Sequence, residues 1–239
     1  MKKKLDANKL QHFLSKSAGK TIYDNKMLDD GDKILVGVSG GKDSLSLLKI
    51  LDYRRRFVPI KYELVVLHVD MHLTKTQLKS LTSFFKINNF NYKIVKLKIK
   101  KSRKKNCFWC AWNRRKVIFE QAAKLGCNKI ALGHHLGDIT ETILMNLFFN
   151  GEISSMLPKQ DLFKGKLTVI RPFAEIAEDR IKQFADYSGL RYSSCNCSYA
   201  DNNKRELMQK LIKQVAKTCP EVRTNILRSL NRIKKDYLP

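Results

Sequence analysis

We expect no segment of this sequence to direct the protein into or across a membrane. No apolar run approaches the roughly 18 residues that a membrane-spanning helix needs. The N-terminus, MKKKLDANKL, begins with the positive charge of a signal peptide, but no apolar stretch follows it. Internal repeats and flexible low-complexity linkers are also absent. With 43% apolar residues, the composition is that of a globular protein, which we expect in the cytoplasm.

Acidic residues are scarce, since the chain has 22 of them against 47 lysines and arginines. The resulting net charge of +25 repels itself unless an anionic partner is usually close. A lysine-rich composition could account for part of the excess, but basic residues also cluster, as RRR at 54–56 and KLKIKKSRKK at 96–105. Such clusters suit the phosphate backbone of a nucleic acid, which they bind by releasing counterions. The charge pattern therefore favours a nucleic-acid-binding protein.

Structural disulfides are not expected for the six cysteines of a protein in a reducing compartment. Four of them form two close pairs, CFWC at 107–110 and CNC at 195–197. The C-x-x-C spacing brings two thiolates to one centre, which could be a redox pair, half of a zinc site or part of a cluster. Cys127 and Cys219 stand alone and are predicted to be buried as small apolar residues.

Short apolar runs alternate with helical segments along most of the chain. Strands are predicted at 33–39, 62–70, 91–99, 128–133 and 167–176. Helices are predicted up to residue 55 and at 74–88, 108–125, 136–149 and 178–189. The strand at 91–99 alternates apolar and charged residues, as an outer strand would.

This alternation predicts an α/β fold, a doubly wound and mostly parallel sheet with helical extensions at both ends. We expect a helical segment at 1–30, a central domain at 31–200 and basic amphipathic helices at 201–239, broken at Pro220. Ligands of such sheets bind at the carboxyl ends of the strands. Three unusual loops follow predicted strands at that edge: SGGKDS at 39–44, HVDMH at 68–72 and GHHLGD at 133–138. We expect these loops to converge on one crevice.

The turn SGGKDS joins the first predicted strand to a helix, whose N-terminus offers unpaired N–H groups and a partial positive charge to an anion. Gly40 and Gly41 let the backbone approach a phosphate without a Cβ between them. An ordinary glycine turn with a serine cap is the alternative.

The side chains of the turn add further groups that suit a phosphate ligand. Ser39 and Ser44 can donate hydroxyl hydrogen bonds, and Lys42 adds a positive charge. Asp43 would be misplaced beside phosphates unless it holds Mg²⁺. SGGKDS after a valine-rich strand resembles the pyrophosphate loop of the N-type ATP pyrophosphatases. The resemblance implies that the protein splits ATP between the α and β phosphates and adenylates its substrate.

The segment LGHHLGDITETILMNLFFNG, 132–151, resembles one shared by tRNA 2-thiocytidine synthetases and lysidine synthetases. The resemblance implies that Asp138 is a second carboxylate for Mg²⁺ and that Gly133 and His134 lie at the ATP. Helix capping or hydrogen bonding is the alternative for the two histidines. At the end of the second strand, His68 and Asp70 are expected to line the nucleotide pocket, although Asp70 could instead cap the next helix.

The cysteine motifs favour the thiocytidine family over the lysidine family, because lysidine synthesis needs no such thiols. The resemblance implies that three cysteines hold a [4Fe–4S] cluster and leave one iron without a protein ligand. Cys107 and Cys110 would be two of them; the third would be Cys195 or Cys197, because CNC is one residue shorter than the family's motif. A structural zinc site with all four thiolates is the alternative. The family's HHxDD is HHLGD here, so Asp138 acts without a second acid.

The resemblance implies an ATP-dependent tRNA sulfurtransferase that adenylates the O2 atom of a cytidine in an anticodon loop and replaces this oxygen with sulfur. The expected catalytic residues are Lys42, Asp43 and Asp138. A tRNA thiolase acting on uridine and a non-RNA sulfur or amide transferase with a zinc site are the alternatives. Expected partners are tRNA, a sulfur donor such as a cysteine desulfurase, and a second copy in a homodimer. Further RNA contacts are expected at Arg114, Arg115 and Arg205. Trp109 and Trp112 are predicted to pack in the core, and stacking on a base is the alternative.

Overall fold

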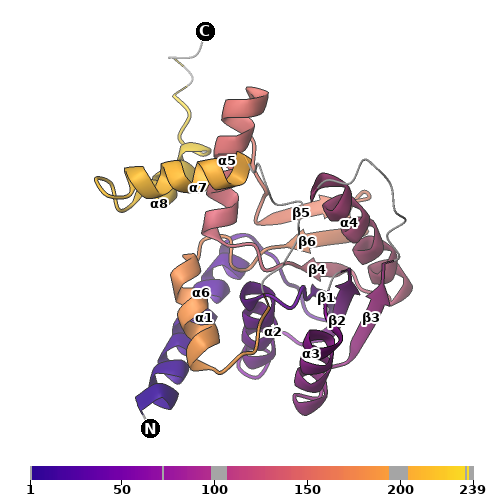
Figure 1. Ribbon diagram of the computed structural model, residues 1–239. Coiled ribbons are helices and arrows are strands. Elements are labelled where there is room, and N and C mark those ends of the chain that lie inside the picture. Colours follow the sequence, from indigo (N-terminus) through magenta and orange to yellow (C-terminus); the bar gives the residue numbers. More distant parts are fainter. Residues whose placement is uncertain (1, 72, 98–106, 194–203, 235, 237–239) are drawn as a thin grey trace.

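The computed structural model describes residues 2–71, 73–97, 107–193, 204–234 and 236, which form a single sheet flanked by helices (Figure 1). The helices are α1 (Lys2–Asp24), α2 (Lys42–Arg54), α3 (Lys75–Ile87), α4 (Cys107–Lys124), α5 (Leu136–Asn150), α6 (Glu178–Tyr187), α7 (Lys204–Val215) and α8 (Val222–Ser229). The strands are β1 (Asp32–Gly37), β2 (Tyr62–Asp70), β3 (Tyr92–Lys96), β4 (Lys129–Ala131), β5 (Lys159–Leu162) and β6 (Leu167–Ile170). None of the helices in these parts of the chain is long and apolar enough to cross a membrane.

The strands lie in the order β3-β2-β1-β4-β6-β5, and all but β5 run parallel. β1 lies in the middle, with Leu35 opposite Val65 of β2 and Ile130 of β4. The prediction of a mostly parallel sheet is confirmed, as is the outer position of β3. Parallel neighbours place the carboxyl ends of β1, β2 and β4 along one edge of the sheet, where the three unusual loops begin.

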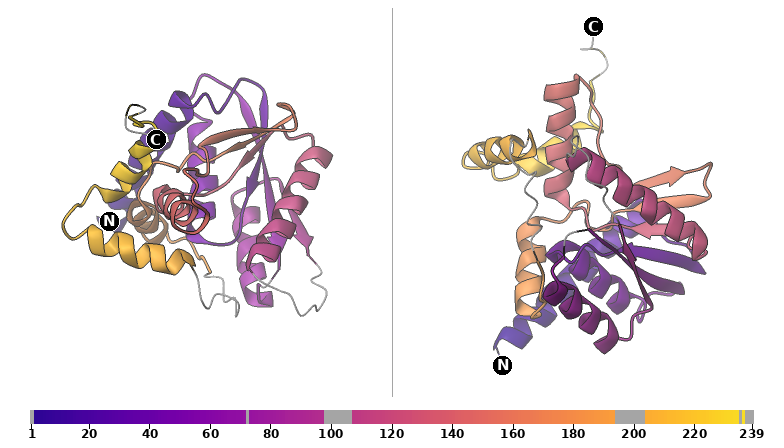
Figure 2. Two further views of the ribbon diagram at one scale, coloured as in Figure 1. Left: turned by 90° about the horizontal axis from the view of Figure 1, so that it is seen from above. Right: turned by 45° about the vertical axis from the view of Figure 1, so that its right-hand side comes forward.

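Both faces of the sheet are covered, which explains why the central strands β1, β2 and β4 are mostly apolar, unlike the outer strands β3 and β5. Leu35 of β1 packs on one face with Ile118 and Ala122 of α4. Neighbouring residues of β1 point to the opposite face, which α1, α2, α3 and α6 cover (Figure 2). The helices on both faces confirm the doubly wound fold.

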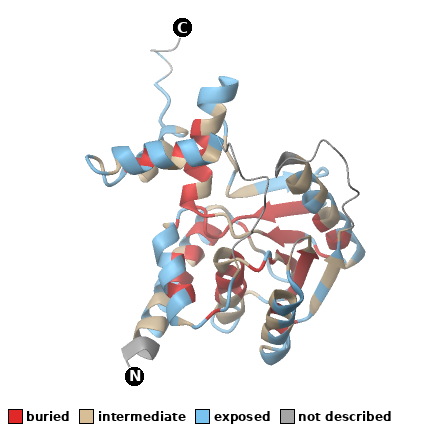
Figure 3. Cartoon of the chain, viewed as in Figure 1, coloured by how far each residue is buried: buried red, intermediate tan, exposed pale blue. Residues whose placement is uncertain are grey.

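α5 projects away from the sheet, and α7 and α8 pack across α5 (Figure 1). Leu144 of α5 is buried against Met208 of α7 and Val222 of α8. Burial is concentrated on the half of α5 nearer the sheet, whereas its far end is exposed (Figure 3). The two C-terminal helices, predicted from the sequence, therefore form a small second core beside the main one.

The sequence does not predict β5, a four-residue strand with the sequence KQDL. This strand pairs antiparallel with β6, so that Gln160 lies opposite Val169. The first predicted strand also ends earlier than expected, at Gly37, and helix α2 begins at Lys42. The glycine turn, residues 39–44, therefore includes the first residues of α2.

Candidate active site

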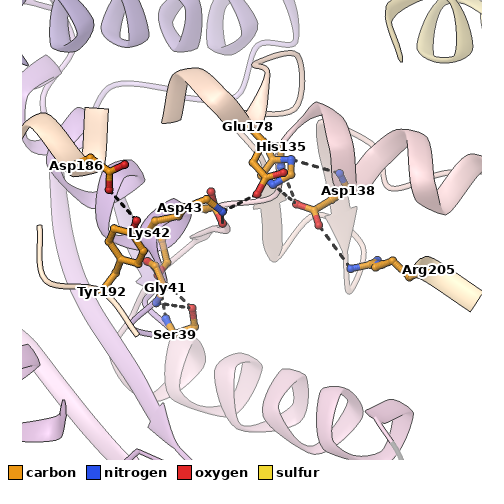
Figure 4. Close-up of polar contacts among 11 residues, drawn as sticks. Ser39, Gly41, Lys42, Asp43, His135, Asp138, Glu178, Asp186, Tyr192 and Arg205 are labelled. Carbon is orange, nitrogen blue, oxygen red and sulfur yellow. Dashed lines mark hydrogen bonds and ion pairs between the residues drawn. The ribbon is translucent and has the colours of Figure 1, made fainter. Parts of the chain in front are cut away.

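The glycine turn is held closed by hydrogen bonds among its own residues (Figure 4). The Gly41 N–H donates to the Ser39 hydroxyl at 3.3 Å, and the Ser44 hydroxyl donates to the Gly41 carbonyl at 3.0 Å. Gly40 has a φ of +91°, which glycine adopts without the strain that a Cβ would cause. Gly41 is the N-cap of α2, and among the described residues no side chain caps this end of the helix. The N-terminus of α2 can therefore offer its N–H groups to an anion.

Lys42 and Asp43 occupy the first turn of α2 and contact each other. The Lys42 ammonium lies 3.2 Å from Asp43 Oδ2 and 2.8 Å from Oε1 of Glu178 in α6. Asp43 Oδ1 is buried and has no hydrogen-bond partner in the part of the chain that the structure describes. Burial raises the pKa of the Asp43 carboxyl, against the opposing effects of His135 and Lys42. An unsatisfied buried carboxylate oxygen beside an anion site suits a bound cation.

Gly133 allows the loop after β4 to lie against the first turn of α2. A Cβ at this position would be 3.0 Å from the carbonyl carbon of Asp43 and 3.0 Å from the Ser44 nitrogen. Because such contacts with backbone atoms cannot be relieved by a rotamer change, a larger residue would require the backbone to shift by a few tenths of an ångström, and glycine is favoured here. The close approach brings the loop at 133–138 and the glycine turn into one site, as predicted.

His135 and Asp138 form a capping box at the start of α5. The His135 N–H donates to Asp138 Oδ2 at 3.0 Å, and the Asp138 N–H donates to His135 Nδ1 at 3.4 Å. The charge of Asp138 contributes to the raised pKa of Asp43, so the two carboxyl groups lie close enough to repel each other. Helix capping, the alternative considered for the histidine pair, thus applies to His135.

His134 contacts Arg171, which follows β6. The Arg171 Nε–H donates to His134 Nδ1 at 3.3 Å. Burial lowers the pKa of His134 to about 4, and the charges of Arg171, Arg205 and Arg114 lower it further against the opposing effect of Asp138. His134 is therefore neutral at physiological pH and can act as a hydrogen-bonding group of the site.

Arg205, in the first turn of α7, reaches back to α5. Its guanidinium lies 3.5 Å from Asp138 Oδ1 and 3.6 Å from Glu141 Oε2. Glu141 is buried, and burial raises the pKa of its carboxyl, against the charge of Arg205. The predicted RNA-binding residue is thus anchored at the candidate site, beside the carboxylate expected to hold Mg²⁺.

The segment before the second cysteine motif also lies at the glycine turn. The Ser193 N–H donates to the Gly40 carbonyl at 3.0 Å. A cavity of about 470 Å³ opens beside this contact, between the segment and α3. Its lining residues are Gly40, Leu73, Thr76, Gln77, Ser80, Leu81, Arg191, Tyr192 and Ser193.

His68 and Asp70, expected in the nucleotide pocket, are not among the residues that line this cavity. His68 is buried, and its Nδ1 lies 2.8 Å from the Val38 carbonyl, directly before the glycine turn. Asp70 Oδ1 accepts a hydrogen bond from the Leu73 N–H at 3.4 Å, while Thr74 caps α3. Asp70 therefore supports the turn that leads into α3, and the capping role considered for it belongs to Thr74 instead.

The cysteine motifs are only partly described. Cys107 begins α4 and Cys110 is half-buried one turn later, whereas Cys195 and Cys197 lie outside the described residues. Arg114, one turn after Cys110, contributes to the low pKa of His134, so the start of α4 is close to the candidate site. Cys127 is buried as predicted, and Cys219 is half-buried against the C-terminal core.

Other predicted RNA-binding residues are spread over the molecule. Arg54 bonds to Ser15 of α1, and Arg55 and Arg56 pair with Asp52, at the end of α2 away from the glycine turn. The cluster at 96–105 lies outside the described residues beyond residue 97.

The two tryptophans differ in exposure. Core packing is wrong for Trp112, whose side chain is 53% exposed with Lys116 over its ring. Trp109 is half-buried. An exposed Trp112 on the helix that carries CFWC can contact a partner.

Three residues of the site are missed by reasoning from the sequence: Glu178, Arg171 and Ser193. Glu178 is 136 residues from the lysine that it contacts, and Ser193 is 153 residues from Gly40. No local pattern marks such pairs. Arg171 offers a weak signal, since it follows a buried strand at the same sheet edge as the other loops.

Comparison with known proteins places the chain among PP-loop proteins. A family model described as a PP-loop domain matches residues 5–215. Among solved structures, the U34-tRNA thiolase NcsA from Methanococcus maripaludis with its [4Fe-4S] cluster superposes with a TM-score of 0.79. The match covers 98% of this chain and 81% of that one at 22% identity, which shows a common fold.

Two relatives match almost the whole sequence. The tRNA-cytidine(32) 2-sulfurtransferase of Syntrophotalea carbinolica is 36% identical, over 97% of this chain and 93% of its own. The protein of the same name from Geobacter sulfurreducens is also 36% identical, over 94% and 91% of the two chains. Identity at this level over nearly the full length of both chains exceeds what a shared fold requires, so the chain belongs to the tRNA-cytidine(32) 2-sulfurtransferase family of PP-loop proteins.

Proposed function

We propose that the protein uses ATP to replace the C2 oxygen of a cytidine in a tRNA anticodon loop with sulfur, giving 2-thiocytidine. The relatives are named for this reaction, with cytidine 32 as the target. One observation carries the proposal. The glycine turn and Asp138 lie at one site, and the described residues just before and just after the CNC motif both contact that site. Ser193 bonds to Gly40 before that motif, and Arg205 pairs with Asp138 after it.

The chemistry needs an activated oxygen, because the carbonyl oxygen of cytosine is a poor leaving group. Attack of O2 on the α-phosphorus of ATP would form an O–P bond, break the bond to the β-phosphate and release pyrophosphate. A sulfur nucleophile would then add to C2, and AMP would leave with the original oxygen. In both steps the phosphate groups carry negative charge, and the N-terminus of α2 and Lys42 would stabilise this charge.

The expected nucleotide-binding residues are Ser39, Gly40, Gly41, Lys42, Asp43, Ser44, His68, Asp70, Gly133 and His134. Asp43 and Asp138 would hold Mg²⁺, and the unsatisfied Oδ1 of Asp43 fits that role. Among the described residues no three acidic, cysteine or histidine side chains form a metal site, which suits an ion that takes its other ligands from phosphates and water. Asp43, Asp138 and Lys42 would be the catalytic residues.

Cys107, Cys110 and one member of CNC would hold a [4Fe–4S] cluster, for which three thiolates are suitable donors. When bound, the cluster would supply an iron that can carry sulfur. The described residue Ser193, which precedes Cys195 by two positions in the sequence, bonds to Gly40 of the glycine turn and so supports a shared site. The first motif begins α4, whose Arg114 acts on His134. The cysteine desulfurase expected as sulfur donor stays a prediction.

Mass spectrometry of tRNA nucleosides from a deletion strain tests the reaction. Loss of 2-thiocytidine supports the proposal, whereas loss of a thiouridine identifies a uridine thiolase. A transferase acting on a small metabolite would leave both nucleosides unchanged, and its release of pyrophosphate would be indifferent to tRNA. For the metal, iron and acid-labile sulfide in anaerobically purified protein support the cluster, and stoichiometric zinc without a chromophore contradicts it.

Two substitutions separate the adenylating part of the site from the cysteine part. Asp43→Asn should abolish release of pyrophosphate from ATP while leaving the iron content unchanged. Cys110→Ser should spare adenylation and lose the iron. If either substitution removed both properties while the protein stayed folded, the division of roles would be wrong.

A second copy of the chain would cover the exposed apolar surface at the end of α5 and along α7. Phe148 and Phe149 are 55% and 40% exposed, and Leu207 and Leu211 of α7 are 54% and 39% exposed. Contiguous exposed apolar surface marks protein interfaces, and these four side chains would contribute to such a surface. Light scattering should therefore detect a dimer that Phe148→Glu converts to a monomer.

A further inference from the structure

The Lys42 ammonium is shared between two carboxylates of different origin (Figure 4). Asp43 is its neighbour in α2, whereas Glu178 approaches from the first turn of α6 at 2.8 Å. An ammonium group carries three N–H donors, so these two contacts leave one for a phosphate oxygen. The side chain of Lys42 is only 17% exposed, so few other orientations are open to it.

We infer that Glu178 positions the Lys42 ammonium at the glycine turn and limits how tightly the turn holds pyrophosphate. The inference deepens the proposed function, on which it rests. Pyrophosphate is the product that would leave the glycine turn after adenylation. A negative charge beside the lysine lowers the attraction of the site for this anion and so favours its release.

The placement of Glu178 is not explained by stability. Its side chain is 54% exposed, and ion pairs that lie partly in water contribute little to the free energy of folding. An acidic residue in the first turn of α6 also interacts favourably with the helix dipole, but Asp179 in the same turn does so as well. The contact with Lys42 distinguishes Glu178.

Both partners of the ion pair carry their charge at neutral pH. Burial acts to raise the pKa of Glu178, but the hydrogen bond and the charge of Lys42 outweigh it and leave the pKa below its usual value. Burial likewise acts to lower the pKa of Lys42, and Glu178 and Asp43 together raise it. The charge of Glu178 therefore acts on the site throughout the physiological pH range.

The test compares the affinities of wild type, Glu178→Gln and Glu178→Asp for magnesium pyrophosphate and magnesium ATP, by titration calorimetry without tRNA. Glutamine keeps the size and a hydrogen-bond acceptor but removes the charge, so pyrophosphate should bind about three- to tenfold more tightly. Aspartate keeps the charge and should stay near the wild-type affinity. With tRNA, Glu178→Gln should also be more strongly inhibited by added pyrophosphate.

Asp179→Asn is the matched control, because it removes a carboxylate from the same exposed helical turn. Its pyrophosphate affinity should equal that of the wild type. Equal affinities of Glu178→Gln and the wild type, or an equal gain in Asp179→Asn, would overturn the inference alone. Failure of the wild type to bind either ligand would instead overturn the proposed function, and the inference with it.

Discussion

At the scale of single residues, Gly133 is a position where one added methyl group should disturb the candidate nucleotide site. In Gly133→Ala the new Cβ would press on the backbone of Asp43 and Ser44 from 3.0 Å. We expect the KM for ATP to rise at least about tenfold and the free energy of unfolding to fall by about 1–3 kcal/mol. Steady-state kinetics and urea unfolding measure the two effects.

Gly151→Ala serves as the control for this prediction. Gly151 ends α5 with a φ of +66°, and a Cβ there would meet no atom of the described residues within 4 Å. The backbone strain should cost about 1–2 kcal/mol of stability without changing the KM for ATP. A rise of the KM in both variants would show that ATP binding responds to stability in general.

The neutral state of His134 predicts how stability depends on pH. Its pKa in the folded protein is about 4, below the value of 6.5 for an unperturbed histidine. Between these values the unfolded chain binds more protons than the folded one, so the contribution of His134 to stability is present above pH 6.5 and lost as the pH falls to 4. The loss should reach at most about 3 kcal/mol.

Urea unfolding at several pH values between 4.5 and 7 tests this expectation. His134→Gln keeps an acceptor for Arg171 but cannot titrate, so its stability should decline less over this range than that of the wild type. If the free energy of unfolding declined equally in the two proteins, protonation of His134 would not be the cause.

At the scale of elements, the attachment of α7 to α5 depends on Arg205. Replacing it in Arg205→Met leaves the buried Glu141 without this cation. We expect a loss of about 1–3 kcal/mol and faster proteolysis within α7, because a buried charge loses a partner. Lys210→Met is the comparison: it breaks an exposed pair with Glu206 on the same helix and should cost less than about 0.5 kcal/mol.

The sequence predicts most elements because their limits depend on local features. Strands covered on both faces are apolar throughout, and Gly151 in the left-handed conformation ends α5. β5 has no such pattern, since its four residues are mainly polar and its conformation depends on pairing with β6. In the same way, the motif SGGKDS alone is enough to predict the candidate site from the sequence. The pairing of Lys42 with Glu178 requires α6 to lie beside the glycine turn, and only the tertiary structure determines that position.

At the scale of the whole molecule, the net charge of +25 predicts that tRNA binding depends strongly on salt. If six or more phosphates are contacted, affinity should fall by about 10³-fold or more between 50 and 200 mM salt. Lys204→Gln, next to Arg205, should lower the slope of log K against log salt by about one.

Arg56→Gln is the control for Lys204→Gln. Arg56 lies just after the end of α2 that is farther from the glycine turn, and it already pairs with Asp52. It should change neither the affinity for tRNA nor the slope. Filter binding over a salt series measures both variants. Equal effects of the two substitutions would indicate that RNA extends over the end of the molecule away from the glycine turn.

The central place of β1 has a consequence for synthesis on the ribosome. β1 ends at Gly37, but its neighbour β4 is complete only at Ala131. At translation rates of about 5–20 residues per second, the edge of β1 that pairs with β4 stays unpaired for about 5–19 seconds after β1 has been synthesised. The nascent chain should therefore be captured by chaperones in this interval, and slow codons between the two strands should lower the yield of native enzyme.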